Sequence, residues 1–263
     1  MTDKRKLYWD GSYFDYWLKR TRERGGGLSN LISGDAKTPD EAIYSLLIKS
    51  CPFYKKSVLE IGCGFGRLFT IFLEEKMDIY GVDISEKMIK EAKNQWNTTE
   101  NIKLLKVSAA EKLSFDDCSF DNVVCIATFD ATYQNESLAE MIRVCSVGGN
   151  IYISGKNNQY HETDCKALEA EHNARNKGHP NYFTDVKKMM HLIQQTKCLE
   201  VNKSFYFENR GDSTENKFKV KPLLRFYDYF FVFKKINHKK INFINFSYKY
   251  SETFKEVNNG KMG

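Results

Sequence analysis

Ser57-Val58-Leu59-Glu60-Ile61-Gly62-Cys63-Gly64-Phe65-Gly66-Arg67 is the stretch that decides the fold. An apolar run with β-branched members, three alternating glycines and an apolar periodic segment predict a strand, a tight loop and a helix. Glycines let the backbone turn sharply and approach a ligand more closely than a Cβ permits, and amides at a helix start favour polar or anionic groups. Because an ordinary strand-to-helix turn needs only one glycine, we interpret this loop as the cradle of a cofactor.

The chain beyond this loop alternates strand-like and helix-like segments at close spacing, which is typical of a parallel sheet with helices on both faces. Strands are expected at 57–61, 79–84, 102–107, within 120–129 and at 151–154. Two later strand-like runs, 199–207 and 226–234, predict a closing antiparallel hairpin. The expected fold is α/β: a doubly wound, Rossmann-like, seven-stranded sheet, mostly parallel, with helices on both faces.

Three regions surround or interrupt this pattern in the 263 residues. Residues 1–36 are dense in aromatic and basic side chains and are expected to form a helical cap, either as packing or as a lid over the cofactor. The main domain spans 37–235 and contains a loosely patterned segment, 156–182, which we interpret as the acceptor loop because loops this long usually have a function. Residues 236–263 form a basic segment to which no element is assigned.

The composition describes a globular chain, with 41% hydrophobic and 14% aromatic residues. No apolar run approaches the roughly 20 residues needed to cross a bilayer, and no export signal follows Met1, so a cytoplasmic location without membrane contact is expected. The seven cysteines are scattered without a C-x-x-C pair. This spacing predicts reduced thiols and no metal site.

The net charge of +6 is unevenly distributed. The part from Lys217 onward carries eleven Lys and Arg residues against three acidic ones, a balance of +8, which leaves −2 for the rest. A near-neutral body with a basic tail is weak evidence for polyanion binding. Nucleic acid is therefore an unlikely partner, and we expect a small-molecule one.

Polar residues follow the second and third expected strands. Asp83 closes the second strand, and Ser108-Ala109-Ala110-Glu111 follows the third. The carboxyl ends of parallel strands meet at one edge of a doubly wound sheet, where ligands bind at the reversal of strand order. A carboxylate there accepts both hydroxyl hydrogens of a ribose, so the sequence predicts a nucleoside-type cofactor site.

The glycine spacing separates two cofactor classes. A dinucleotide loop, G-x-G-x-x-G, would require glycine at position 67, where Arg67 stands, which disfavours a nicotinamide oxidoreductase. Residues 58–66, the strand end 81–85, the Ala110-Glu111 pair and the segment 120–124 together resemble the successive motifs of class I S-adenosylmethionine-dependent methyltransferases. The resemblance covers residues 40–155 most strongly.

This resemblance implies S-adenosylmethionine as cofactor, S-adenosylhomocysteine as product and no metal. The glycines would contact the methionine part and the ribose, Asp83 the ribose hydroxyls, and Ala127 would lie beneath the sulfonium. Met88 is equally explained as core packing. The implied cofactor residues are Glu60, Gly62, Cys63, Gly64, Gly66, Asp83, Ile84, Met88, Ala109, Ala110, Glu111 and Ala127.

The implied reaction is a direct displacement on a methyl group already activated by positive sulfur, so positioning is the main task of the protein. A base is required only when the acceptor is a hydroxyl or a protonated amine. The candidate catalytic residues are His161, Asp130 and Tyr133, which follow the fifth and fourth strands. The candidate substrate-binding residues are Tyr8, Tyr13, Trp17 and Tyr160.

The acceptor class is narrowed by residues that are missing. The fourth strand is followed by Thr128-Phe129-Asp130-Ala131, without the prolines of nucleic-acid amino-methyltransferases, and no acidic set suggests a catechol-type magnesium site. We expect methyl transfer to O or N of a small polar metabolite, such as a sugar or a sugar-phosphate precursor of a cell-surface glycan. An RNA-directed methyltransferase using the basic C-terminal segment, and a non-catalytic cofactor-binding protein, stay open as alternatives.

Overall fold

The computed structural model describes residues 3–16 and 39–260 and contains a seven-stranded sheet of order β3-β2-β1-β4-β5-β8-β7. Neighbouring strands from β3 to β5 are parallel, whereas β8 runs antiparallel to both β5 and β7. This architecture confirms the predicted fold class. The strands are β1 (Ser57–Ile61), β2 (Asp78–Asp83), β3 (Ile102–Val107), β4 (Phe120–Cys125), β5 (Cys145–Lys156), β7 (Leu199–Phe207) and β8 (Asp228–Lys235).

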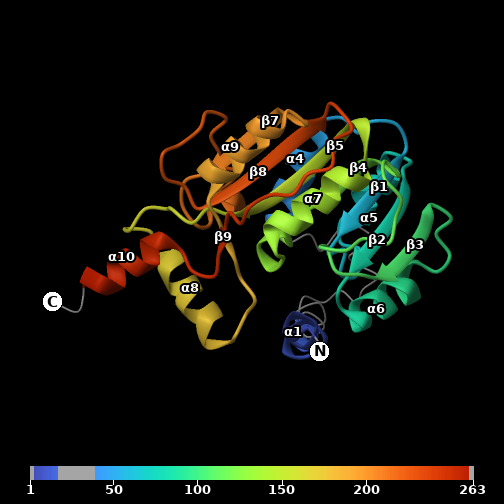
Figure 1. Ribbon diagram of the computed structural model, residues 1–263. Helices are drawn as coiled ribbons and strands as arrows, with labels where there is room; N and C mark the ends of the chain where they lie inside the picture. Colours follow the sequence, from blue (N-terminus) through green and yellow to red (C-terminus); the bar gives the residue numbers. More distant parts are fainter. Residues whose placement is uncertain (1–2, 17–38, 261–263) are drawn as a thin grey trace.

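Two helical layers cover the sheet (Figure 1). On one face the helices α4 (Pro39–Lys49), α5 (Phe69–Glu74) and α6 (Glu86–Trp96) share a buried apolar cluster with the strands. On the other face, α7 (Gln134–Val144) and α9 (Val186–Thr196) share a second cluster. Burial of both faces explains the continuous apolar run of β4, whose residues 122–125 are all fully buried.

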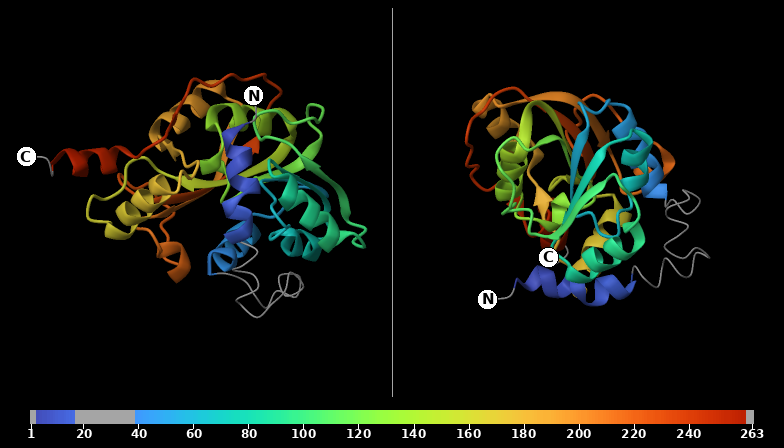
Figure 2. Two further views of the ribbon diagram at one scale, coloured as in Figure 1. Left: turned by 90° about the horizontal axis from the view of Figure 1, so that it is seen from below. Right: turned by 90° about the vertical axis from the view of Figure 1, so that its right-hand side faces the viewer.

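The strand order reverses at β1, which lies between β2 and β4. A helix from the N-terminal region, α1 (Lys4–Asp10), lies beside the carboxyl ends of the parallel strands, outside both helical layers (Figures 1 and 2). The reversal leaves a crevice at the carboxyl ends of β1 and β4, where open α/β sheets bind their ligands.

Strand β5 begins at Cys145, although the sequence predicts a turn at 147–149 and a strand only from Ile151. The pairing with β4 explains the difference. Phe120 pairs with Cys145 and Asn122 pairs with Asn150, so β5 has more residues than β4 between these two pairs. The extra residues of β5 bulge out of the ladder there, and Gly148 adopts a positive φ of 86°. The glycines therefore mark an irregularity inside the strand.

The segment 156–182 contains a helix, α8 (Cys165–Asn176), which the sequence pattern does not predict. Its buried residues are only Ala167 and Glu171, so it lacks the apolar periodicity on which such predictions depend. The carboxylate of Glu171 accepts hydrogen bonds from the hydroxyls of Tyr160 (2.8 Å) and Ser251 (2.6 Å). A buried polar network, instead of an apolar stripe, thus holds this helix.

The C-terminal segment also has structure. The strand β9 (Ser247–Tyr248) pairs with β6 (Phe183–Thr184), and α10 (Glu252–Gly260) extends away from the sheet (Figure 1). Phe243 and Phe246 are buried in the core cluster that contains α7 and α9. The described part of 236–260 is therefore packed on the domain through isolated aromatic residues.

Asn122, fully buried in β4, provides a test of the fold. Its side chain accepts a hydrogen bond from the Tyr54 N–H (3.0 Å) and donates to the carbonyls of Tyr54 and Ser57 (2.8 and 3.0 Å). We expect Asn122→Ala to lower the free energy of unfolding by about 3 kcal/mol, because buried backbone groups lose their partners. In urea denaturation, exposed Asn94→Ala serves as control; equal effects of the two variants would contradict this account.

Candidate functional site

The glycine loop is fastened to the neighbouring strand. The N–H groups of Gly62 and Cys63 both donate to the carbonyl of Val82, at 2.7 and 3.0 Å. Gly62 and Gly66 have positive φ angles of 73° and 85°. A Cβ on Gly62 would lie 2.2 Å from Cγ2 of Thr128, and one on Gly66 would lie 2.5 Å from Cδ2 of Phe69. Both positions therefore require glycine for conformation and for space.

Asp83 joins the ends of β1 and β2. One carboxylate oxygen accepts the N–H of Gly64 (2.9 Å) and the other accepts the N–H of Ser85 (2.8 Å). Each oxygen retains a lone pair for a ligand hydroxyl. Burial raises the pKa of Asp83, against the opposing effect of these two N–H groups. The carboxylate is thus fixed in place while it lines the cavity described below.

Ala127, just after β4, has a left-handed conformation with φ of 53°, which is uncommon for a residue with a side chain. Its N–H donates to the hydroxyl of Ser154 on β5 (2.8 Å), which helps to hold this conformation. Strained residues cluster at functional sites. The strain here positions Ala127 opposite the glycine loop, in the wall of the cavity.

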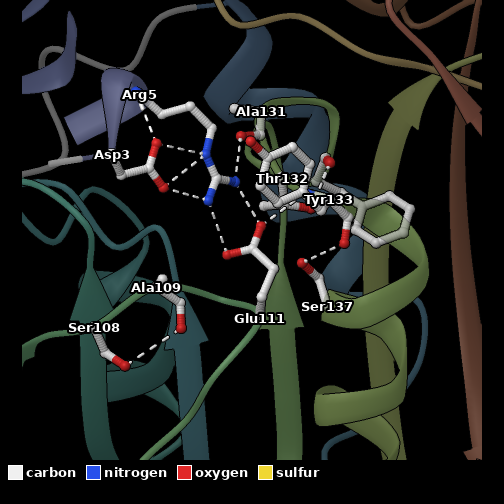
Figure 3. A network of polar contacts seen from close by, with 10 residues as sticks. Asp3, Arg5, Ser108, Ala109, Glu111, Ala131, Thr132, Tyr133 and Ser137 are labelled. Atoms are coloured by element: carbon white, nitrogen blue, oxygen red, sulfur yellow. Dashed lines mark hydrogen bonds and ion pairs between the residues drawn. The ribbon is translucent and has the colours of Figure 1, made fainter. Parts of the chain in front are cut away.

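An ion pair connects α1 to the segment that follows β3 (Figure 3). The guanidinium of Arg5 donates to both carboxylate oxygens of Glu111, at 2.5 and 3.2 Å, and Glu111 also accepts the N–H of Tyr133 (2.7 Å). Arg5 also pairs with Asp3 and lies 4.1 Å from the ring centre of Tyr133. Burial alone would lower the pKa of Arg5, but its hydrogen bonds to Glu111 and Asp3 raise the pKa above its usual value.

These elements enclose a first cavity of about 780 Å³, solvent at its mouth included. It contains eight of the twelve residues that the resemblance implies for the cofactor: Gly62, Gly64, Asp83, Ile84, Met88, Ala110, Glu111 and Ala127. Further lining residues that the sequence analysis did not select are Arg5, Trp9, Ile61, Phe65, Arg67, Ser108, Thr128, Ala131 and Thr132. The cavity therefore lies where the strand order reverses, under α1.

Four of the twelve implied residues, Glu60, Cys63, Gly66 and Ala109, do not line this cavity. Glu60 and Cys63 are buried behind the loop, and Gly66 carries the backbone into α5. Burial raises the pKa of Glu60 well above its usual value, and within the described part of the chain no group hydrogen-bonds to its Oε2. Glu60, Cys63 and Gly66 therefore act on the shape of the loop, whereas Ala109 follows β3.

A second cavity adjoins the first and shares Trp9, Tyr13, Ala127 and Ala131 with it. Asp130 lines this second cavity and forms an ion pair with Lys156, which also lines it. Several polar and aromatic residues complete the wall: Tyr44, Ser154, His179, Phe207, Arg210, Ser213, Thr214, Asp228 and Tyr229. A ligand here would lie beside the mouth of the first cavity.

Some of the other candidate residues line a cavity and others do not. Asp130 and Tyr13 line the second cavity, and Tyr8 lines an outer vestibule that shares Tyr13, Lys156, His179 and Arg210 with it. Tyr133 and His161 line none of these three cavities; His161 faces Glu208 at 3.4 Å on the surface. Trp17 lies outside the described residues.

Tyr160, which the sequence analysis expects to bind substrate, lies inside the fold. Its side chain is fully buried, packs edge-on against Tyr227, and donates its hydroxyl to Glu171. It lines none of the three cavities described above. Tyr160 instead belongs to the polar network that holds α8 against the C-terminal segment.

Arg5 and His179 line these cavities although the sequence does not predict either as a site residue. Arg5 stands among ordinary polar residues. Its side chain is held in the site by Glu111, which lies 106 positions later in the chain. His179 lies between Gly178 and Pro180 in the loosely patterned segment, where only the preceding left-handed glycine, with φ of 64°, hints at a defined turn. Neither position carries a local sequence signal.

Within residues 3–16 and 39–260, no cluster of three or more His, Cys, Asp or Glu residues could hold a metal ion. None of the helices in the same ranges is long and apolar enough to cross a membrane. The arrangement that the described residues do provide is a nucleoside-sized site next to a polar and aromatic chamber.

Comparisons with known proteins agree with this geometry. Residues 58–149 match the methyltransferase domain family. A ubiquinone/menaquinone biosynthesis C-methyltransferase from Bordetella avium is 32% identical over 100 residues, which are 36% of this chain and 39% of that protein. The chain therefore matches about two fifths of the length of this curated relative.

Two solved structures share the fold. A possible histamine N-methyltransferase from Thermotoga maritima is similar with a TM-score of 0.59 at 18% identity, over 88% of this chain and 99% of that one. A phosphoethanolamine N-methyltransferase from Haemonchus contortus, solved with S-adenosylhomocysteine, gives a TM-score of 0.63 at 14% identity, over 90% and 61%. At these identities the similarity shows a shared fold and nothing further.

The buried carboxyl of Glu60 predicts a pH-dependent stability. Because its pKa is raised in the folded chain, the folded state holds a proton that the unfolded state releases above about pH 4.3, so this group destabilises the fold increasingly as pH rises. Glu60→Gln removes this effect. We expect the melting temperature of the variant to exceed that of the wild type by a margin that grows from about pH 5 to about pH 8.

Calorimetry across this pH range measures that margin. Exposed Glu100→Gln serves as control and should show no growing difference. A margin for Glu60→Gln that stays constant with pH would contradict the assignment.

Removing Arg5 from its pair with Glu111 should lower the free energy of unfolding. Arg5→Met leaves the carboxylate of Glu111 largely buried without its cation, which costs roughly 3 kcal/mol of unfolding free energy. The neighbouring Lys6→Met removes only an exposed pair with Glu86 and should change the melting temperature little. Urea denaturation of both variants measures the difference, and equal midpoints would show that Arg5 does not anchor α1.

Proposed function

We propose that this chain, a class I S-adenosylmethionine-dependent methyltransferase by its domain over residues 58–149 and by its fold, methylates a small polar metabolite. The observation that carries the proposal is the common wall of the two cavities. A cofactor site and a separate chamber meet at Ala127 and Ala131, under Trp9 and Tyr13. Two reactants held on either side of that wall would be positioned for a direct transfer.

The residues of the first cavity fit S-adenosylmethionine. The glycine loop offers close backbone contact, Asp83 retains acceptor capacity for the ribose hydroxyls, and Ile84 and Met88 provide an apolar wall for the adenine. When bound, this cofactor supplies a methyl group activated by positively charged sulfur. The amino-acid part of the cofactor would extend past Gly62 and Gly64, toward Thr128.

The protein itself contributes position and exclusion of water. The rings of Trp9 and Tyr13 cover the junction of the cavities, and the Arg5–Glu111 pair holds α1 in place above it. Fixing two reactants in a near-attack geometry removes about 7–11 kcal/mol from a barrier in favourable cases. The cap of α1 thereby takes part in catalysis without providing a reacting group.

The second cavity supports a small, polar acceptor. Its wall mixes aromatic faces with the hydroxyls of Ser154, Ser213 and Thr214 and with charged groups of both signs. A sugar or a sugar phosphate presents apolar ring faces and many hydroxyls, which such a wall would bind. Two of the fold neighbours also carry names with small polar acceptors, histamine and phosphoethanolamine, which is consistent with this class.

Asp83 provides the test of cofactor binding. We expect Asp83→Asn to weaken binding of S-adenosylmethionine and S-adenosylhomocysteine by at least about tenfold. The amide N–H₂ would face the N–H group of Gly64 or of Ser85, and the ribose would lose a charged hydrogen-bond acceptor. Asp78→Asn, at the opposite end of β2, is the matched control and should bind normally. Isothermal titration calorimetry measures both constants.

Turnover provides the test of the acceptor class. The protein is incubated with methyl-labelled S-adenosylmethionine and a small-molecule extract of the cells that produce it, and the labelled product is identified by mass. We expect one small polar product, absent with Asp83→Asn. Cofactor binding without any labelled small molecule would overturn the proposed activity, and label found only in RNA would favour the RNA-directed alternative.

A further inference from the structure

A group of three reactive side chains lies at the end of the sheet opposite the cavities. Cys118 stands just before β4, whereas Ala127 in the cavity wall follows the other end of this strand. The Sγ of Cys118 lies 3.1 Å from Nδ1 of His238 and 3.4 Å from Nζ of Lys235, the last residue of β8. The fold thus brings together a thiol, an imidazole and an ammonium group that are 117 and 120 positions apart in the chain.

The ammonium group of Lys235 is a buried positive charge. Lys235 is 2% exposed, and Nζ donates to the carbonyls of Ile142 and Cys145, both at 2.7 Å, in addition to the sulfur of Cys118. These three bonds use all the hydrogens of an ammonium group. Among the described residues, no carboxylate forms an ion pair with Lys235. A buried charge without an opposite charge is costly, so this ammonium favours negative charge on the sulfur beside it.

The imidazole of His238 is placed to take the proton of this thiol. The separation of Sγ and Nδ1 is within hydrogen-bond reach, as required for a nucleophile and its base. The proton between them stands on sulfur in the thiol form and on nitrogen when the sulfur is a thiolate. His238 is exposed to solvent and Cys118 is half-buried, so the pair lies at the surface of the protein. Reactive cysteines typically have such electropositive, partly exposed surroundings.

We infer that Cys118 is a nucleophilic thiol that hydroperoxides oxidise, with His238 as its base and Lys235 as a fixed positive charge. None of the three cavities described above includes Cys118, so the site suits a reagent of a few atoms that needs no binding pocket. A hydroperoxide is such a reagent. The site is separate from the cofactor cavity, and the inference is independent of the proposed methyl transfer.

The step balances with the hydroperoxide as the other reactant. The thiol proton passes to Nδ1 of His238, a lone pair of the sulfur forms a bond to the terminal peroxide oxygen, and the O–O bond breaks. The leaving oxygen takes the proton from the imidazolium and becomes water or an alcohol. The sulfur is oxidised to a sulfenic acid and the peroxide is reduced. A sulfenic acid is a reversible product, because it condenses with a second thiol.

Hydrogen peroxide tests the inference on the full, previously reduced chain. Dimedone traps the sulfenic acid, and mass spectrometry of the peptides gives the rate at each cysteine. We expect Cys118 to be oxidised at least about tenfold faster than Cys165, although Cys165 is the more exposed of the two. Equal rates, or faster oxidation of Cys165, would overturn the inference, because exposure would then determine reactivity.

The variant His238→Gln tests the role of the imidazole, with the neighbouring Lys239→Gln as matched control. Both side chains are exposed, so both variants should keep the wild-type melting temperature. We expect His238→Gln to slow the oxidation of Cys118 by about tenfold or more and to leave Cys165 unchanged. Lys239→Gln should change neither rate. An unchanged rate at Cys118 in His238→Gln, or equal slowing in both variants, would overturn the inference.

Iodoacetamide separates a nucleophilic thiol from one that hydroperoxides oxidise. The wild-type chain should be alkylated at Cys118 before Cys165, in the same order as with hydrogen peroxide. Preferred alkylation of Cys118 without preferred oxidation would overturn the assignment of hydroperoxides as its reagents.

Discussion

The hydrogen bond from the N–H of Gly64 to the carboxylate of Asp83 is the contact on which the site depends. It joins the ends of two parallel strands, β1 and β2, at the place where the strand order reverses. The loop can reach Asp83 only because its glycines accept positive φ angles and leave room for Thr128 and Phe69. The first cavity lies beside this connection, with the strained Ala127 opposite and the second cavity beyond.

A second constraint comes from the N-terminal helix. The sheet leaves one edge open. The helix α1 covers that edge through the buried Arg5–Glu111 pair and the ring of Trp9, and Tyr13, just after α1, adds a second ring. The same rings surround His179 at the end of α8. The N-terminal rings thus line both cavities together with the sheet, which contributes Ser154, Phe207 and Tyr229 to the second cavity.

The sequence predicts eight of the residues that line the first cavity because each of its signals is local. Alternating glycines, an acid at a strand end and apolar strands reflect the backbone and burial requirements of a few adjacent residues. The acceptor side could not be predicted in this way. Arg5 meets Glu111 across 106 positions, α8 is held by the polar residue Glu171, and His179 has no local motif. The sequence predicts a substrate contact for Tyr160 because it has no feature that distinguishes a buried aromatic ring in a loop from an exposed one, whereas the structure buries this ring.

A crystal structure of the full chain with S-adenosylhomocysteine would show whether the first cavity binds the cofactor. We expect the ribose hydroxyls on the carboxylate of Asp83, the adenine beside Ile84 and Met88, and the sulfur at Ala127, facing the cavity that His179 lines. A nucleoside bound in the second cavity, or a sulfur that faces away from the shared wall, would contradict it.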